Sequence, residues 1–164
     1  MAKLKEDVRA QSFANVQFRA YQSRDNLAES LSLPDVHLIS LRAELEGLIV
    51  PSKYYGIAAA GRPAIFIGDP QGEIGQLLTK TQTGFVVAQG DSETLAHTIL
   101  MLAQAPLLSA DYGRRARYHF ERTHDVSFAI AAWEEAILSH DDGKPSAHCT
   151  ARFSSRDPPS TTKP

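Results

Sequence analysis

The chain has 164 residues, the length of one ordinary domain built around a single hydrophobic core. Hydrophobic residues make up 43% and charged residues 22%, a balance typical of globular domains. The net charge of −2 argues against an overall nucleic-acid-binding surface, and no apolar run approaches the roughly 18–20 residues of a membrane span. Cys149 is the only cysteine, which excludes an intrachain disulfide and a cysteine-rich zinc site.

The start of the chain is charged and lacks the apolar core of a secretory signal. We therefore expect a cytoplasmic protein with at most peripheral membrane contact and no nucleic-acid partner. Near residue 139 the composition changes, because 139–164 is rich in Ser, Thr, Pro and charge. Such a segment buries too little apolar surface to offset its ordering entropy. We predict one domain over 1–138 and a disordered tail over 139–164.

Strand and helix patterns alternate along 1–138. Short apolar or alternating runs predict strands at 15–18, 36–39, 63–67 and 84–87. Helical periodicity and capping signals predict helices at 3–13, 23/24–31, 51–60, 72–78, 91/92–103, 106–124 and 126–138. Pro51 suits the first position of its helix, and Gly61 suits the position after the last turn.

This order predicts an α/β fold, a doubly wound, Rossmann-like parallel sheet of about four strands with helices on both faces. Ligands of such sheets bind in the loops at the carboxyl ends of the strands. Those loops here are 19–21, 40–50, 68–72 and 88–91.

The loop at 40–50 and the helix after it have the residues of a phosphate and sugar site. Glu46 can accept hydrogen bonds from sugar hydroxyls, and Gly47 allows close approach of the backbone. The following helix start favours phosphate, and Lys53 in its first turn adds a positive charge. Glu73 brings a second carboxylate from the next loop. The alternative interpretations are a solvated acidic loop for Glu46 and a favourable charge at a helix start for Glu73.

Residues 15–138 resemble the C-terminal half of the group 1 retaining nucleotide-sugar glycosyltransferases of the GT-B fold. They are most similar to those that make bacterial surface polysaccharides. The resemblance is carried, in order, by 15–18 (NVQF), 35–41 (DVHLISL), 46–53 (EGLIVPSK), 59–63 (AAGRP), 72–74 (GEI), 84–87 (GFVV), 90–91 (GD) and 95–96 (LA).

The resemblance implies binding of a uridine or guanosine diphosphate sugar as donor, with no further cofactor and no metal. It implies sugar transfer to a glycan or lipid-linked acceptor, and it identifies no catalytic residue in this chain. The implied donor-binding residues are Glu46, Gly47, Leu48, Ser52, Lys53 and Glu73. The implied base-proximal residues are Arg19, Ala20 and Tyr21.

Two features depart from the family pattern. The second Glu of its paired-Glu motif, which holds the ribose, is replaced by Tyr54 or, in another register, by Gly56. The opening strand, helix and strand of this half, with their basic diphosphate clamp, are missing, as is the acceptor-binding half. We therefore expect an incomplete GT-B C-terminal half that is inactive alone. Its sheet edge would need a homodimer or a chain supplying the N-terminal half.

Two other functions stay open: a non-catalytic fragment or interaction module that needs a partner chain, and part of a nucleotide-sugar epimerase. His119 and His124 are five residues apart and are not expected to share a helix face or hold a metal. Arg114, Arg115 and Arg117 are interpreted as a solvated helix face, and Trp133 as a core or interface residue.

Overall fold

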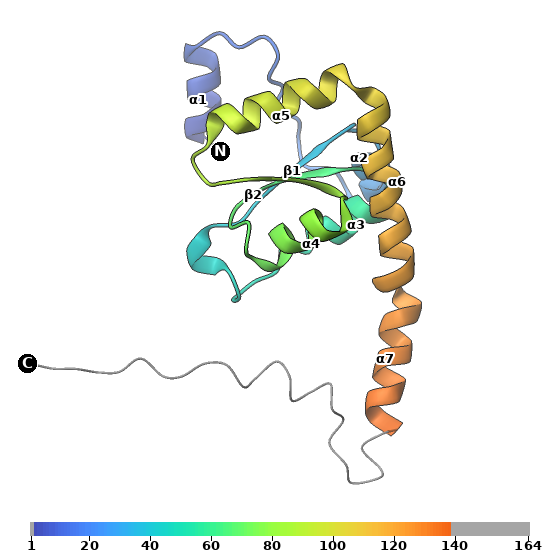
Figure 1. Cartoon of the computed structure of the whole chain (residues 1–164). Coiled ribbons are helices and arrows are strands. Elements are labelled where there is room, and N and C mark those ends of the chain that lie inside the picture. The colour runs from blue at the N-terminus through green and yellow to red at the C-terminus, as the bar shows by residue number, and fades with distance from the viewer. Residues whose placement is uncertain (1, 139–164) are drawn as a thin grey trace, which may run out of the picture.

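The computed structural model describes residues 2–138, so the predicted tail at 139–164 lies outside the described residues. Three strands, β1 (His37–Ser40), β2 (Ala64–Ile67) and β3 (Gly84–Val87), form a parallel sheet in the order β1-β2-β3 (Figure 1). The register aligns Ile39 with Phe66 and Phe66 with Val86. The predicted α/β class with a parallel sheet is confirmed.

Helices surround the sheet, and most begin and end within a few residues of their predicted bounds. They are α1 (Ala2–Ala10), α2 (Leu27–Ser32), α3 (Lys53–Ala59), α4 (Glu73–Thr81), α5 (Ser92–Gln104), α6 (Pro106–Thr123) and α7 (Val126–Leu138), with 3₁₀ turns at Arg24–Asn26 and Ala43–Leu45. Pro51 precedes α3 by two residues and does not occupy its first position, but its carbonyl accepts from the Tyr54 N–H at 3.0 Å.

The predicted strand at 15–18 is wrong. This segment is irregular and exposed, and its Phe18 ring contacts the Lys5 ammonium at 5.5 Å. A strand needs a neighbour to pair its N–H and C=O groups, and residues 15–18 pair with none of the three strands that the structure describes. The described sheet therefore has three strands where about four were expected, and β1 is an edge strand.

The sheet is covered on both faces, as predicted. Side chains alternate along a strand, so Phe66 and Ile65 of β2 point to opposite sides. Phe66 packs with Ile57 of α3 and Ile74 of α4, whereas Ile65 packs with Leu102 of α5. In Figure 1, α5 lies on one side of the strands and α3 and α4 on the other.

One close contact fixes α6 against the end of α3. Gly61 follows α3 with φ +68°, the left-handed conformation that glycine adopts readily. A Cβ on Gly113 of α6 would lie 2.2 Å from the Gly61 carbonyl oxygen. Gly113 therefore lets the helix backbone approach this turn directly.

We predict that Gly113→Ala destabilises the fold by about 1–3 kcal/mol, because the methyl group would collide with backbone. The matched control is Gly56→Ala within α3, where the nearest atom is the flexible Leu31 Cδ1 at 3.1 Å. Alanine favours helix over glycine at both positions, so Gly56→Ala should be neutral or stabilising. Urea unfolding compares the two, and equal effects would contradict this account.

Candidate functional site

The loops that follow β1 and β2 meet at the carboxyl edge of the sheet. The 3₁₀ turn Ala43–Leu45 ends at Glu46, whose Oε1 accepts a hydrogen bond from the backbone N–H of Glu73 at 2.9 Å. Glu73 is the first residue of α4. Two residues that the sequence analysis selected from separate loops are thus in direct contact.

Glu46 is half-buried, and its carboxylate caps the start of α4. A negative charge at a helix N-terminus is favourable because the first N–H groups have no partner within the helix. Gly72 makes room for it: a Cβ there would lie 2.4 Å from the Glu46 Cδ and about as close to both carboxylate oxygens. The contact therefore requires glycine at position 72.

The loop at 68–72 is itself tightly folded. Asp69 Oδ1 accepts from the Gln71 N–H at 2.8 Å, and the Asp69 carbonyl accepts from the Gly72 N–H at 3.0 Å. A Cβ on Gly75 would lie 2.5 Å from the Asp69 carbonyl oxygen, so α4 starts directly against this turn. The turn fixes the direction in which α4 presents its first N–H groups to Glu46.

Ser52 and Lys53 lie at the start of α3, in the same connection after β1 that holds Glu46. Both are exposed, and the Ser52 side chain does not cap the helix. They line a cavity of about 340 Å³ together with Ser40 at the end of β1. Between this cavity and Glu46, Gly47 has φ +76° and Leu48 is 72% exposed.

Neither register of the paired-Glu motif brings a carboxylate to the site. Tyr54 is a core residue, and its hydroxyl is 3.0 Å from Thr83 Oγ1. Burial raises the pKa of the Tyr54 hydroxyl, which keeps it neutral. Gly56 faces Leu31 of α2.

Residues Arg19, Ala20 and Tyr21 lie in the exposed segment before α2. Tyr21 is fully exposed, and Gln22 Nε2 donates to the Ala20 carbonyl at 3.2 Å. The proximity of these residues to a base stays a prediction.

Sequence reasoning missed a ring cluster beside Glu73. His119 and His124 have ring centroids 5.4 Å apart, and the Tyr55 ring is 4.8 Å from His124. The two rings approach each other although they do not share a helix face, because α6 ends at Thr123 and His124 follows it with φ −131° and ψ 0°. Thr123 Oγ1 lies 3.2 Å from His119 Nδ1 and 2.5 Å from His124 Nδ1. A five-residue spacing carries no signal for this arrangement.

Charge and burial set the titration of this cluster. Burial lowers the pKa of His119 and of His124, and the neighbouring His119 lowers the pKa of His124 further, while Glu73 opposes this. Burial and the negative charge of Glu73 raise the pKa of Tyr55. Within residues 2–138 there is no group of three or more His, Cys, Asp or Glu placed to hold a metal ion.

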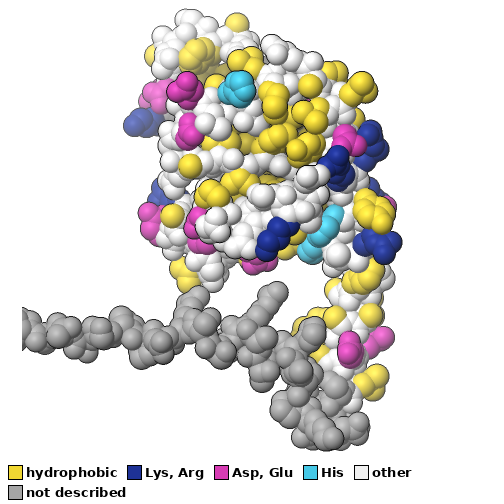
Figure 2. All heavy atoms as spheres, in the orientation of Figure 1, with side chains coloured by type: hydrophobic (Ala, Val, Ile, Leu, Met, Phe, Trp, Pro, Cys, Tyr) yellow, Lys and Arg dark blue, Asp and Glu magenta, His cyan; other side chains and the backbone are white. Residues whose placement is uncertain are grey.

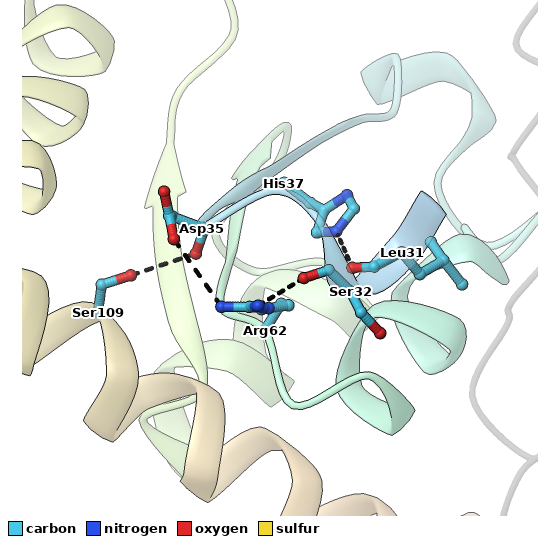
Figure 3. Close-up of polar contacts among 6 residues, drawn as sticks. All are labelled: Leu31, Ser32, Asp35, His37, Arg62 and Ser109. Carbon is cyan, nitrogen blue, oxygen red and sulfur yellow. Dashed lines mark hydrogen bonds and ion pairs between the residues drawn. The ribbon is translucent and has the colours of Figure 1, made fainter. Parts of the chain in front are cut away.

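A second cavity, of about 510 Å³, lies at the amino-terminal ends of β1 and β2, next to α5 and α6. Its walls are mainly apolar and include Leu38, Ile65 and Ile99. The polar groups at its rim tie elements together (Figure 3): Arg62 contacts Asp35 at 3.9 Å and donates to the Ser32 carbonyl at 2.5 Å. Because these groups hold α2 and the start of β1 in place, we interpret this end as structural.

A three-stranded parallel sheet with helices on both faces is consistent with a Rossmann-like fragment. The curated protein "Putative colanic acid biosynthesis glycosyl transferase WcaI" of Escherichia coli (strain K12) is 31% identical to this chain over 124 residues. The similarity covers 76% of this chain and 30% of that protein, and it supports a relationship with the glycosyltransferases.

No family model matches the chain, and no solved structure matches it. Within the described residues, no helix has the length and hydrophobicity needed to cross a membrane.

We predict that Glu46→Ala destabilises the fold by about 1 kcal/mol, because α4 loses its cap. Glu44→Ala is the matched control, since Glu44 is an exposed carboxylate two residues earlier in the same turn. Chemical unfolding in urea measures both. A Glu46→Ala variant as stable as Glu44→Ala would contradict the capping role.

The histidine cluster predicts a loss of stability in weak acid. Both histidines have a folded-state pKa below the ordinary 6.5, so the unfolded chain binds protons more readily. Their contribution is complete above that value and is lost as the pH falls below it. We expect the melting temperature to fall between about pH 7.5 and pH 5, and the double variant His119→Gln, His124→Gln to flatten this dependence. The exposed His97→Gln is the control and should leave the pH dependence unchanged.

Proposed function

We propose that this chain binds a nucleotide diphosphate sugar at the carboxyl edge of its sheet. It would form the donor-binding part of a GT-B glycosyltransferase that transfers a sugar to a glycan or lipid-linked acceptor. The observation that carries the proposal is the Glu46 carboxylate held at 2.9 Å from the first N–H group of α4, where two strand-end loops meet. The similarity to a glycosyl transferase over 76% of the chain supports the same assignment.

Glu46 can contact a sugar without giving up its structural role. Its Oε1 accepts from Glu73, and a carboxylate has two oxygens with about four acceptor positions in total. A sugar hydroxyl can therefore donate to the same carboxylate while the cap stays intact. The cap also fixes the carboxylate in place before the donor arrives, which lowers the entropy lost on binding.

The diphosphate would lie toward the start of α3. The Lys53 ammonium supplies a positive charge there, next to the cavity lined by Ser40 and Ser52. Gly47 and Leu48, on the exposed backbone between Glu46 and this cavity, would offer N–H groups to the sugar and phosphate. Catalysis in the complete enzyme would then rest on donor positioning and on stabilisation of the departing diphosphate, with retention at the sugar carbon.

The isolated chain is proposed to bind the donor without transferring it. The chain spans about a third of the curated relative that it matches, with 30% of that protein covered. The described sheet ends at β1, an edge strand whose Leu38 is 53% exposed. A partner chain that supplies the acceptor site would complete the enzyme, and an open edge strand is a ready surface for pairing.

Isothermal titration of the full chain with uridine and guanosine diphosphates and their sugars tests the binding proposal. We expect binding by one nucleotide class, and a dissociation constant raised roughly tenfold by Lys53→Ala, which removes a charge from the site. Lys80→Ala in the last turn of α4 is the matched control, because its ammonium bonds to Gln76 Oε1 at 3.0 Å on the same helix. No binding at millimolar ligand, or equal effects of both variants, would contradict the proposal.

A further inference from the structure

A joint of two residues connects the last two helices of the described fold. Helix α6 ends at Thr123 and α7 begins at Val126, so the joint consists of His124 and Asp125. The N–H groups of both joint residues donate to the Phe120 carbonyl, at 2.8 and 3.0 Å, and Phe120 packs against the core. No residue of α7 is buried, and Figure 1 shows α7 continuing beyond the end of α6, away from the sheet. The direction of α7 therefore depends on the joint.

One hydroxyl bonds both histidine rings beside the joint. Thr123 Oγ1 lies 3.2 Å from His119 Nδ1 and 2.5 Å from His124 Nδ1, and it also donates to the His119 carbonyl at 2.6 Å. A hydroxyl has a single proton, so once the carbonyl has taken it the oxygen can only accept from the two rings. This network assigns an N–H to the Nδ1 of each neutral ring, and it leaves each Nε2 as the atom that takes up the next proton.

The groups that face His124 come from three helices. The ring centroid of Tyr55 in α3 lies 4.8 Å from that of His124, and the centroid of His119 in α6 lies 5.4 Å from it. Burial and His119 lower the pKa of His124, whereas the Glu73 carboxylate at the start of α4 raises it. A positive charge on His124 alone therefore has a negative neighbour, but a further charge on His119 would face a positive one.

The surroundings of His119 also contain basic side chains. His119 lines a cavity of about 420 Å³ together with Arg114 and Arg115. Asp111 pairs with both arginines, at 2.9 and 2.6 Å, so its charge is already engaged. In Figure 2, histidine side chains reach the surface between α4 and α6, with basic side chains on either side of them. This environment does not favour a second positive charge.

Other charged groups near the joint have partners of their own. Arg117 bonds Glu121 Oε1 at 2.6 Å and also donates to the Ala59 carbonyl. Asp125 Oδ1 accepts from the N–H and the hydroxyl of Ser127, at 3.1 and 3.0 Å, and this caps the start of α7. The positive charge of Arg117 also helps to lower the pKa of Asp125, after its hydrogen bonds to Ser127. These contacts stabilise the joint while the two histidines are not both charged.

We propose that protonation of both His119 and His124 opens the joint and frees α7 to change its direction. Two imidazolium rings with centroids 5.4 Å apart repel each other, and Glu73 can offset only one of the two charges. His119 is held within α6, so His124 is the ring that moves away. Its movement breaks the bond to Thr123 and the contact with Tyr55, which hold the joint against α3. This inference does not depend on the proposed donor binding.

The distance between α7 and the body of the fold measures this opening. In a full chain with Cys149→Ser, spin labels on Glu93→Cys of α5 and Glu135→Cys of α7 report it by pulsed electron spin resonance, and both positions are exposed. We expect one narrow distance distribution at about pH 7.5 and a second population at about pH 5.5, where histidine gains its charge. Salt at about 1 M should reduce the second population, because it screens the repulsion between partly exposed charges.

A single substitution separates the effect of the pair from that of one histidine. His119→Gln leaves His124 without a like-charged ring beside it, so the narrow distribution should persist at the lower pH. The matched control is His97→Gln, which removes an exposed histidine of α5 and should still show the second population. A distribution that does not change with pH, or that changes in His119→Gln as it does in His97→Gln, would overturn the proposal.

Assigned magnetic resonance signals of the isotope-labelled chain distinguish opening of the joint from unfolding. The histidine pair should titrate in two steps, and in His119→Gln the ring of His124 should titrate at higher pH, because His119 lowers its pKa. The amide signals of His124 and Asp125 should move with the second step, while those of Ile65 and Phe66 in β2 stay in place. Loss of the β2 signals at the same pH would mean global unfolding and would overturn the proposal.

Discussion

The burial of β2 on both of its faces is the constraint on which the rest of this structure depends. Ile65 and Phe66 are fully buried and point in opposite directions, one toward α5 and the other toward α3 and α4. Parallel pairing on both sides fixes the direction of β1 and β3 as well. The loops that follow β1 and β2 must therefore emerge at the same edge, and this places Glu46 next to the start of α4.

The contact between Glu46 and the Glu73 N–H links the stability of the fold to its proposed activity. One carboxylate satisfies an N–H group that would otherwise have no partner and remains able to accept hydrogen bonds from a sugar. Gly72 is the residue that permits this arrangement, since any side chain there would displace the carboxylate. Gly72 is needed for the space it leaves to the carboxylate, because its φ of −66° is one that other residues also adopt.

Local patterns predicted the class of the fold and most element bounds because β2, β3 and the long helices are decided by hydrophobic periodicity and caps. Asp91, for example, accepts from the Thr94 N–H at 3.0 Å, as its position before α5 indicated. The predicted strand at 15–18 was wrong because a strand forms only by pairing with a neighbouring strand, and a local sequence pattern does not show whether such pairing occurs. The contact of Glu46 with α4 and the approach of His124 to His119 depend on loop direction, and residue spacing does not specify it.

The most direct measurement is a titration of isotope-labelled full chain with a uridine or guanosine diphosphate sugar, followed by backbone amide chemical shifts. The account predicts that the largest changes fall at the carboxyl edge of the sheet, on Gly47, Lys53 and Glu73. Unchanged spectra at millimolar ligand would contradict it. Changes confined to the cavity at the amino-terminal ends of the strands, around Arg62 and Ile99, would also contradict it.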